Sequence, residues 1–170
     1  PIRTLRASDG VTLAYRAYLP DHPVAGVVFY HGGGAHSGAG YAHLAAGLRD
    51  GSGVAVYTPD IRGHGYSQGE RGDAPSTEQL FRDVDGFVDL VRGAHPDRPL
   101  FIGGHSSGAG LVLNYATWEG CSPVDGYLFV SPQLGFRSKT ERDATRNGSS
   151  PFAVARTAPF IINAISGGRL

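Results

Sequence analysis

Short apolar runs alternate with longer amphipathic runs along the chain. The short runs are rich in β-branched and aromatic residues and end at glycine or proline, which is typical of buried strands. Four such runs are 26–30, 54–57, 100–102 and 126–130. A looser alternation over 11–18 predicts an earlier strand or hairpin arm.

The stretches between these runs have apolar positions at helical spacing. Helices are predicted over 41–48, 76–94 and 109–118. The second is the clearest, because Ser76 and Gln79 have the spacing of a capping box. Its apolar stripe consists of Leu80, Val84, Phe87, Val88 and Val91, and the residues off the stripe are Asp83, Asp85, Asp89 and Arg92.

Strands that are buried on both faces and separated by helices predict a mostly parallel sheet with helices on both faces, so the fold class is α/β. The composition changes after Pro132. Residues 131–151 are polar and rich in Ser and Arg, and an apolar segment at 152–165 follows them. Residues 134–170 are therefore expected to leave the sheet.

Length and composition exclude several classes of protein. A chain of 170 residues with 41% hydrophobic and 18% charged residues is expected to form one globular domain. With 15 basic and 15 acidic side chains, nothing in its charge favours nucleic acid as a partner. Cys121 is the only cysteine, which excludes an internal disulfide and a cysteine-based zinc site. A cytoplasmic location is expected, with membrane association as the alternative.

A candidate nucleophile lies between a predicted strand and a predicted helix. Gly104-His105-Ser106-Ser107-Gly108 fits the pattern G-x-S-x-G, the nucleophile elbow of α/β-hydrolases. So tight a turn holds Ser106 in a strained backbone conformation, and side chains at the two glycines would collide. The turn would raise the serine hydroxyl above the sheet at a helix N-terminus, where negative charge is favoured.

A glycine-rich loop, His31-Gly32-Gly33-Gly34, directly follows the first buried run. We expect the backbone N–H groups of Gly33 and Ser107 to bind the oxyanion of a tetrahedral intermediate. A phosphate-binding loop is the competing interpretation. It fails because no Gly-Lys-Ser/Thr follows the glycines and no G-x-G-x-x-G can be laid over residues 32–40.

Four segments together resemble the monoacylglycerol lipase and lysophospholipase branch of the α/β-hydrolases. They are HGGGAHSG at 31–38, DIRGHGYSQGER at 60–71, GHSSG at 104–108 and VSP at 130–132. The resemblance covers about residues 8–134, and its most specific part is the segment 60–71. The chain departs from the pattern at Ala35, where an acidic residue is frequent.

The resemblance implies a serine carboxylic ester hydrolase that forms an acyl-enzyme on Ser106. Its oxyanion hole would consist of the backbone N–H groups of Gly33 and Ser107, and its substrate would be a small-molecule ester or a lipid. The candidates for the substrate pocket are His31, Gly32, Gly34 and Phe160. A hydrolase-like protein that binds a ligand without turnover, and an acyltransferase, are the alternatives.

The base and the acid of a catalytic triad are missing from the chain. In this branch the order is Ser, then Asp, then His. No histidine follows His105, and the aspartates after Ser106 are Asp125, at the wrong end of a strand, and Asp143, in the polar segment. The resemblance therefore implies that residues 1–133 are the N-terminal part of a hydrolase core and that 134–170 begin a cap. A C-terminal remainder of the same protein would supply the base and acid, and the chain alone would be nearly inactive.

The remaining candidates concern loops, metals and membranes. By the resemblance, His31 and His64 hold loops together. His36 and His43 lack an accompanying cluster of acids or cysteine, so neither a metal nor another cofactor is expected. The apolar cap residues, Phe160 among them, predict contact with membranes or micelles, or equally packing against the missing half of the domain.

Overall fold

The computed structural model describes residues 1–134, which form six strands and three helices. In chain order these are β1 (Ile2–Arg6), β2 (Thr12–Tyr18), β3 (Ala25–Tyr30), α1 (Tyr41–Ser52), β4 (Val54–Pro59), α2 (Thr77–Ala94), β5 (Leu100–His105), α3 (Ser107–Ala116) and β6 (Gly126–Val130). None of the helices in this part of the chain is long and apolar enough to cross a membrane.

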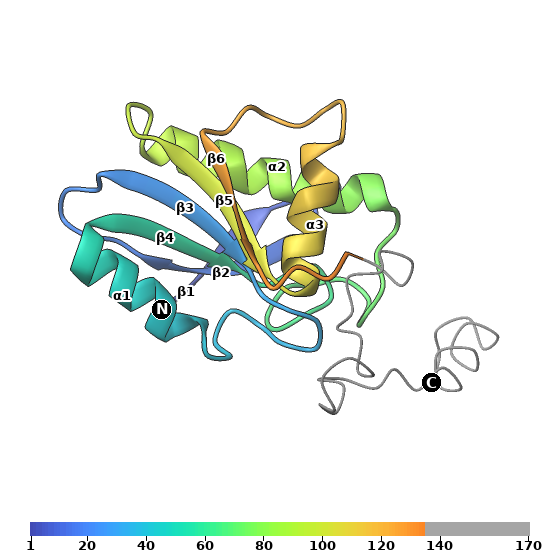
Figure 1. Cartoon of the computed structure of the whole chain (residues 1–170). Helices are drawn as coiled ribbons and strands as arrows, with labels where there is room; N and C mark the ends of the chain where they lie inside the picture. Colours follow the sequence, from blue (N-terminus) through green and yellow to red (C-terminus); the bar gives the residue numbers. More distant parts are fainter. Residues whose placement is uncertain (135–170) are drawn as a thin grey trace, which may run out of the picture. The chain divides into compact units, whose positions relative to one another are not determined.

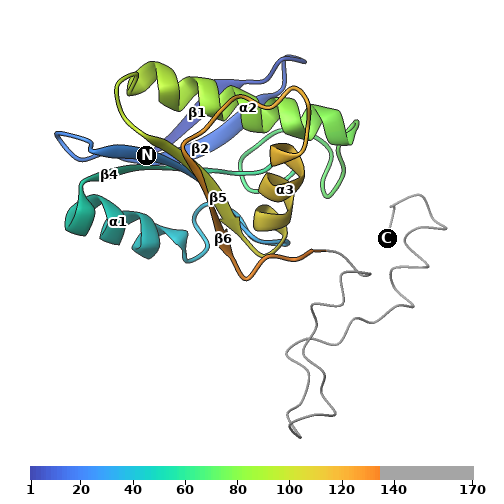
Figure 2. The same cartoon turned by 45° about the horizontal axis from the view of Figure 1, so that its top comes forward.

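The strands form one mostly parallel sheet in the order β1-β2-β4-β3-β5-β6. The four strands from β4 to β6 are parallel, and β2 joins β4 in the antiparallel sense. Helix α1 covers one face, and α2 and α3 cover the other (Figures 1 and 2). The predicted α/β class, with helices on both faces, is confirmed.

The outermost strand, β1, has no counterpart in the sequence prediction. Its residues are almost all exposed, so they show no apolar alternation. It exists because its backbone pairs with that of β2 in antiparallel register, from Ile2 opposite Arg16 to Arg6 opposite Thr12. Such a strand depends on the neighbouring backbone rather than on burial.

Helix α2 contributes Val84, Phe87, Val88 and Val91 to the core. The side chain of Ser76 accepts from the Gln79 N–H at 3.1 Å, which confirms the predicted start of the helix. On the buried stripe, the Phe87 ring packs edge-on against Tyr15 and Tyr30, with centroids 5.5 and 6.4 Å away. These contacts fix α2 across the middle of the sheet.

Asp83, which the periodicity placed off the apolar stripe of α2, is nevertheless buried. Arg62 donates to both of its carboxylate oxygens at 2.7 Å and donates also to Asp9, at 2.8 and 3.1 Å. The Arg62 side chain is only 1% exposed. A buried charge needs such partners, so this triad joins the turn before β2, the loop after β4 and α2.

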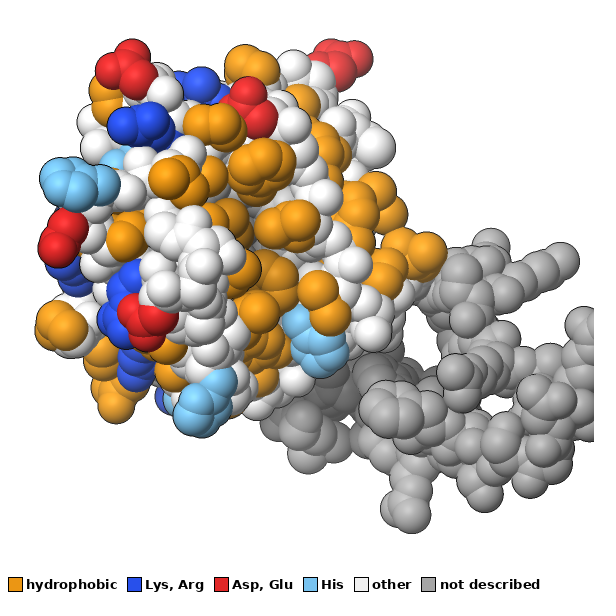
Figure 3. Space-filling model, turned by 60° about the vertical axis from the view of Figure 1, so that its left-hand side comes forward, with side chains coloured by type: hydrophobic (Ala, Val, Ile, Leu, Met, Phe, Trp, Pro, Cys, Tyr) orange, Lys and Arg blue, Asp and Glu red, His pale blue; other side chains and the backbone are white. Residues whose placement is uncertain are grey.

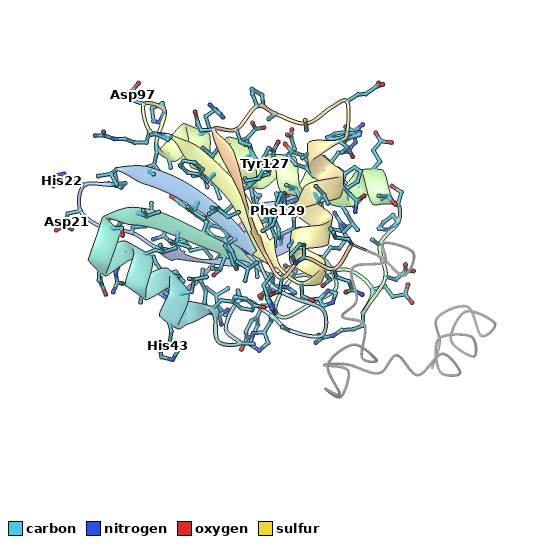
Figure 4. The ribbon with its side chains drawn as sticks, viewed as in Figure 1. Asp21, His22, His43, Asp97, Tyr127 and Phe129 are labelled. Atoms are coloured by element: carbon cyan, nitrogen blue, oxygen red, sulfur yellow. The ribbon has the colours of Figure 1, made fainter. Side chains whose placement is uncertain are left out.

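Strand β6 was expected to be buried, and this prediction is wrong for the part of the chain described. Its apolar side chains are about two-fifths exposed, from 38% at Tyr127 to 46% at Val130. The cause is position: β6 pairs with β5 on one edge, and no strand within residues 1–134 pairs with its other edge. The Tyr127 and Phe129 rings stack along it (Figure 4), and hydrophobic side chains spread over one face of the molecule (Figure 3).

We predict that Asp83→Ala in the full-length protein lowers the free energy of unfolding by about 3 kcal/mol, because it removes one of the two carboxylates of residues 1–134 that pair with the buried Arg62 charge. Urea unfolding measures this loss. Asp89→Ala, at an exposed position of the same helix, is the matched control and should change stability by less than about 0.5 kcal/mol. Equal effects of the two changes would contradict a stabilising triad.

Candidate active site

Ser106 stands alone between the end of β5 and the start of α3, with φ 54° and ψ −118°. A positive φ is rare for a residue with a side chain and carries strain. The turn leaves no space beside it: a Cβ on Gly104 would lie 2.5 Å from the Gly108 carbonyl carbon, and one on Gly108 would lie 2.3 Å from the His31 carbonyl oxygen. The strained turn expected from the motif is present.

Backbone hydrogen bonds hold Ser106 in this conformation. Its N–H donates to the Val130 carbonyl at 3.0 Å, and its carbonyl accepts from the N–H groups of Gly110 and Gln133 at 3.1 and 3.0 Å. The end of β6 and the first turn of α3 are therefore both fastened to the elbow. The Ser106 side chain is half-buried, and its Oγ forms no hydrogen bond with any residue of the described part.

The glycine loop lies directly against the elbow. A Cβ on Gly32 would lie 3.3 Å from Ser106 Cβ, and one on Gly33 would lie 3.3 Å from Ser107 Oγ. Gly33 and Gly34 are exposed, whereas Gly32 is buried. The structure thus brings Gly33 close to Ser107, the two residues whose backbone N–H groups were expected to bind one oxyanion.

His31 connects this loop to the loop after β4. Its side chain is 1% exposed; its Nδ1 lies 2.8 Å from the Gly32 carbonyl, and its Nε2 lies 3.0 Å from the Ile61 nitrogen. The carbonyl can only accept and the amide can only donate, so the ring is neutral with its proton on Nδ1. Burial, and secondarily the neighbouring His64, lowers the pKa of His31. With both nitrogens engaged, this placement favours holding the loops over lining a substrate pocket.

Asp60 is a second support that the sequence analysis did not single out. Its carboxylate is buried and accepts from the N–H groups of Ser37 at 2.6 Å and Tyr66 at 2.9 Å. A Cβ on Gly65 would lie 2.3 Å from the same carboxylate. The segment 60–71, the most distinctive of the chain, therefore supports the glycine loop. The spacing between its acid and its glycines is the sequence feature from which this supporting role could have been predicted.

An open groove of about 500 Å³ lies beside the glycine loop. Its described walls come from residues 34–36 and 63–72, and no carboxylate among the residues of 1–134 lines it. The residues with side chains that line it are Ala35, His36, His64, Tyr66 and Arg71.

The two aspartates that were not assigned to the triad, and the predicted cap, do not contribute to this site within the described residues. Asp125 accepts from the Leu100 N–H at 2.8 Å, where β5 begins, so it belongs to the opposite end of the sheet from Ser106. Asp143, Phe160 and the predicted cap beyond Leu134 lie outside the described residues. Within 1–134, no histidine nitrogen or carboxylate forms a hydrogen bond with Ser106 Oγ.

A strained serine between a parallel strand and a helix, on a sheet covered on both faces, defines the class of α/β-hydrolases. The family profile described as serine aminopeptidase, S33, matches residues 21–160. The chain belongs to this family of α/β-hydrolases, and its relatives place it in the branch that resembles monoglyceride lipases.

Two curated relatives and one solved structure illustrate the likeness. The chain is 34% identical to a monoglyceride lipase of Mus musculus over 74% of its own length and 41% of the relative's. It is 36% identical to a monoacylglycerol lipase of Mycolicibacterium smegmatis, over 62% of the chain and 38% of the relative. A soluble variant of monoglyceride lipase from Saccharomyces cerevisiae matches with a TM-score of 0.65 at 26% identity, over 76% of this chain and 44% of that one. The chain spans about two-fifths of the length of these relatives.

Two glycine-to-alanine changes should have opposite effects on stability. Gly108→Ala forces a Cβ to within 2.3 Å of a backbone oxygen, so we expect a loss of about 3 kcal/mol or more. Gly47→Ala on α1 meets nothing within 4 Å and should stabilise the protein by about 0.5–1 kcal/mol through helix propensity. Thermal unfolding of both variants measures these shifts, and a neutral Gly108→Ala would contradict the packing of the elbow.

His31 should make stability depend on pH. Its folded-state pKa lies below its ordinary value of 6.5, so the unfolded chain takes up a proton first, and stability falls as the pH drops through about 6.5 toward the folded pKa. Urea unfolding between pH 7.5 and 5 measures this dependence. His31→Gln should flatten the curve, whereas His43→Gln, on the exposed side of α1 (Figure 4), should retain it. Superimposable curves for wild type and His31→Gln would refute the assignment.

Proposed function

We propose that the full-length protein is a serine carboxylic ester hydrolase in which Ser106 is the nucleophile. The observation that carries this proposal is the strained backbone of Ser106, beside an exposed glycine loop, with a hydroxyl that forms no hydrogen bond within residues 1–134. Ser106 Oγ attacks the ester carbonyl and loses its proton to a base, and the alcohol leaves with a proton. Water then attacks the acyl-enzyme, releases the carboxylic acid and restores the hydroxyl.

The oxyanion of each tetrahedral intermediate is stabilised by the N–H groups of Gly33 and Ser107. The close approach of Gly33 to Ser107 supports this assignment, as does the position of Ser107 at the first turn of α3, where the helix dipole favours negative charge. Each such donor typically lowers the barrier by about 2.7–4 kcal/mol.

The base and its acid come from sequence outside this chain. In support, His31 uses both ring nitrogens inside the protein, and the Asp60 carboxylate is occupied by two backbone amides. The outer edge of β6, which no strand within residues 1–134 pairs with, offers a place for further strands of the core, whose ends would carry the missing groups. The 170-residue chain alone therefore lacks the relay that activates Ser106.

The substrates are esters of the monoacylglycerol kind, as the names of the relatives suggest, or of the lysophospholipid kind, which the sequence resemblance also implies. The polar alcohol part of the ester lies in the groove beside the glycine loop, where His36, Tyr66 and Arg71 offer hydrogen-bonding groups. Ala35 contributes no negative charge there and Arg71 contributes a positive one, so this groove suits neutral and anionic alcohols better than cationic ones.

A fluorophosphonate probe tests the nucleophile. We expect the full-length protein to be labelled at Ser106, and Ser106→Ala to lose labelling and to lower kcat on esters by about 10⁴–10⁶-fold. Ser52→Ala, at the exposed end of α1, is the control and should behave as wild type. A folded full-length protein without labelling would instead identify a hydrolase-like binding protein.

The 170-residue chain should be nearly inactive by itself. We expect its kcat on a monoacylglycerol to be about 10⁴–10⁶-fold below that of the full-length protein, because only the oxyanion donors and binding remain. Intact-mass measurement of the assayed sample excludes contamination by longer protein. Full activity in a sample whose mass matches 170 residues would refute the proposal that the base and the acid lie outside this chain.

A further inference from the structure

Tyr41, the first residue of α1, links the glycine loop to the strand that carries Ser106. Its Oη lies 2.8 Å from the Gly32 nitrogen and 3.1 Å from His105 Nδ1. We propose that Tyr41 and His105 form a positioning pair that orients the oxyanion donor Gly33 relative to Ser106. This inference rests on the proposed function and adds a residue outside the motifs to it.

The direction of the hydrogen bonds follows from the available protons. The Gly32 N–H can only donate, so it donates to Tyr41 Oη. The single hydroxyl proton of Tyr41 is then free to be donated to His105 Nδ1, which accepts it when the imidazole carries its own proton on Nε2. A directed chain thus runs from the glycine loop through Tyr41 to the last residue of β5.

This chain fixes the peptide that bears the Gly33 donor. The Gly32 carbonyl and the Gly33 N–H belong to one planar trans peptide, so they point in opposite directions. His31 Nδ1 donates to that carbonyl on one side, and Tyr41 holds the preceding N–H of Gly32. With both ends of Gly32 anchored, the Gly33 N–H has one orientation, away from His31.

His105 links the position of the glycine loop to that of the nucleophile. His105 directly precedes Ser106, and a Cβ on Gly32 would lie 3.1 Å from His105 Nδ1. The glycine loop and the histidine ring are thus in contact beside the elbow. Displacement of the loop would require breaking the hydrogen bond through Tyr41 as well as this contact.

The contribution of the Tyr41 hydroxyl can be tested separately from that of its ring. The ring packs against Phe29 and His105, with centroids 6.1 and 6.2 Å away. Tyr41→Phe keeps this packing and removes only the hydrogen-bonding oxygen. A purely structural role for Tyr41 would leave the kinetics of Tyr41→Phe unchanged.

Tyr57→Phe is the matched control. Tyr57 Oη also hydrogen-bonds a histidine, His95 Nε2 at 2.9 Å. That histidine follows α2 at the amino-terminal ends of β3 and β5, the end of the sheet where Figure 4 labels Asp97. The control therefore deletes the same kind of hydrogen bond away from the elbow.

The experiment measures hydrolysis of a monoacylglycerol by the full-length wild type and both variants, with folding checked by thermal unfolding. We expect Tyr41→Phe to lower kcat about 10-fold, to change KM less than about 2-fold, and to slow fluorophosphonate labelling of Ser106 by the same factor as kcat. Tyr57→Phe should keep wild-type kcat and labelling. The double variant Tyr41→Phe/His105→Phe should be no slower than His105→Phe alone, since both changes break one chain.

Hydrogen exchange at the Gly32 amide separates this inference from the proposed function. Faster exchange in Tyr41→Phe than in wild type is expected whether or not the protein hydrolyses esters. Wild-type kcat and wild-type Gly32 exchange in a folded Tyr41→Phe would overturn the positioning pair. A wild-type protein that is not labelled at Ser106 would overturn the proposed function, while accelerated Gly32 exchange would still support the hydrogen bond.

Discussion

The structure depends on the close approach of backbones at the elbow. A Cβ on Gly103 would lie 2.3 Å from the Leu128 carbonyl oxygen, and one on Gly108 would lie equally close to that of His31. Strand β6, strand β5, helix α3 and the glycine loop therefore meet there with no side chains between them. This contact fixes the register of β5 against β6, brings Gly33 beside Ser107, and provides the surroundings that hold Ser106 at a positive φ.

Loops at the ends of parallel strands lack the regular backbone hydrogen bonds of the sheet. In this protein, buried polar side chains supply hydrogen bonds to the loop backbone instead. His31, Asp60 and Arg62 each have their hydrogen-bonding groups occupied by backbone or by opposite charges. Buried polar groups tolerate few alternative arrangements, because an unpaired one is costly. The segment after β4 thus acts as a rigid support for the glycine loop, and this accounts for its unusual spacing of acid, arginine and glycine.

The sequence predicted those features that local pattern determines. The stripe and cap of α2 require only neighbours along the chain. The turn at Ser106 is also held by distant backbone, but its two glycines form a local motif, so it too was predicted from the sequence. Features that depend on distant partners were not: β1 is set by pairing with β2, Asp83 is buried by Arg62, and β6 is exposed because its outer edge has no partner within residues 1–134. Nothing in the spacing around Tyr41 indicated that its hydroxyl would meet an amide from a different loop.

The left-handed backbone of Ser106 has a consequence for how this protein can change over evolution. Glycine is the residue that such a conformation suits best, and a strained non-glycine residue costs on the order of 1–3 kcal/mol. A mutation from serine to glycine would therefore make the fold more stable and at the same time delete the hydroxyl proposed to attack the ester. At this position, selection for stability favours glycine and selection for catalysis favours serine. A serine here is therefore evidence of selection for catalysis.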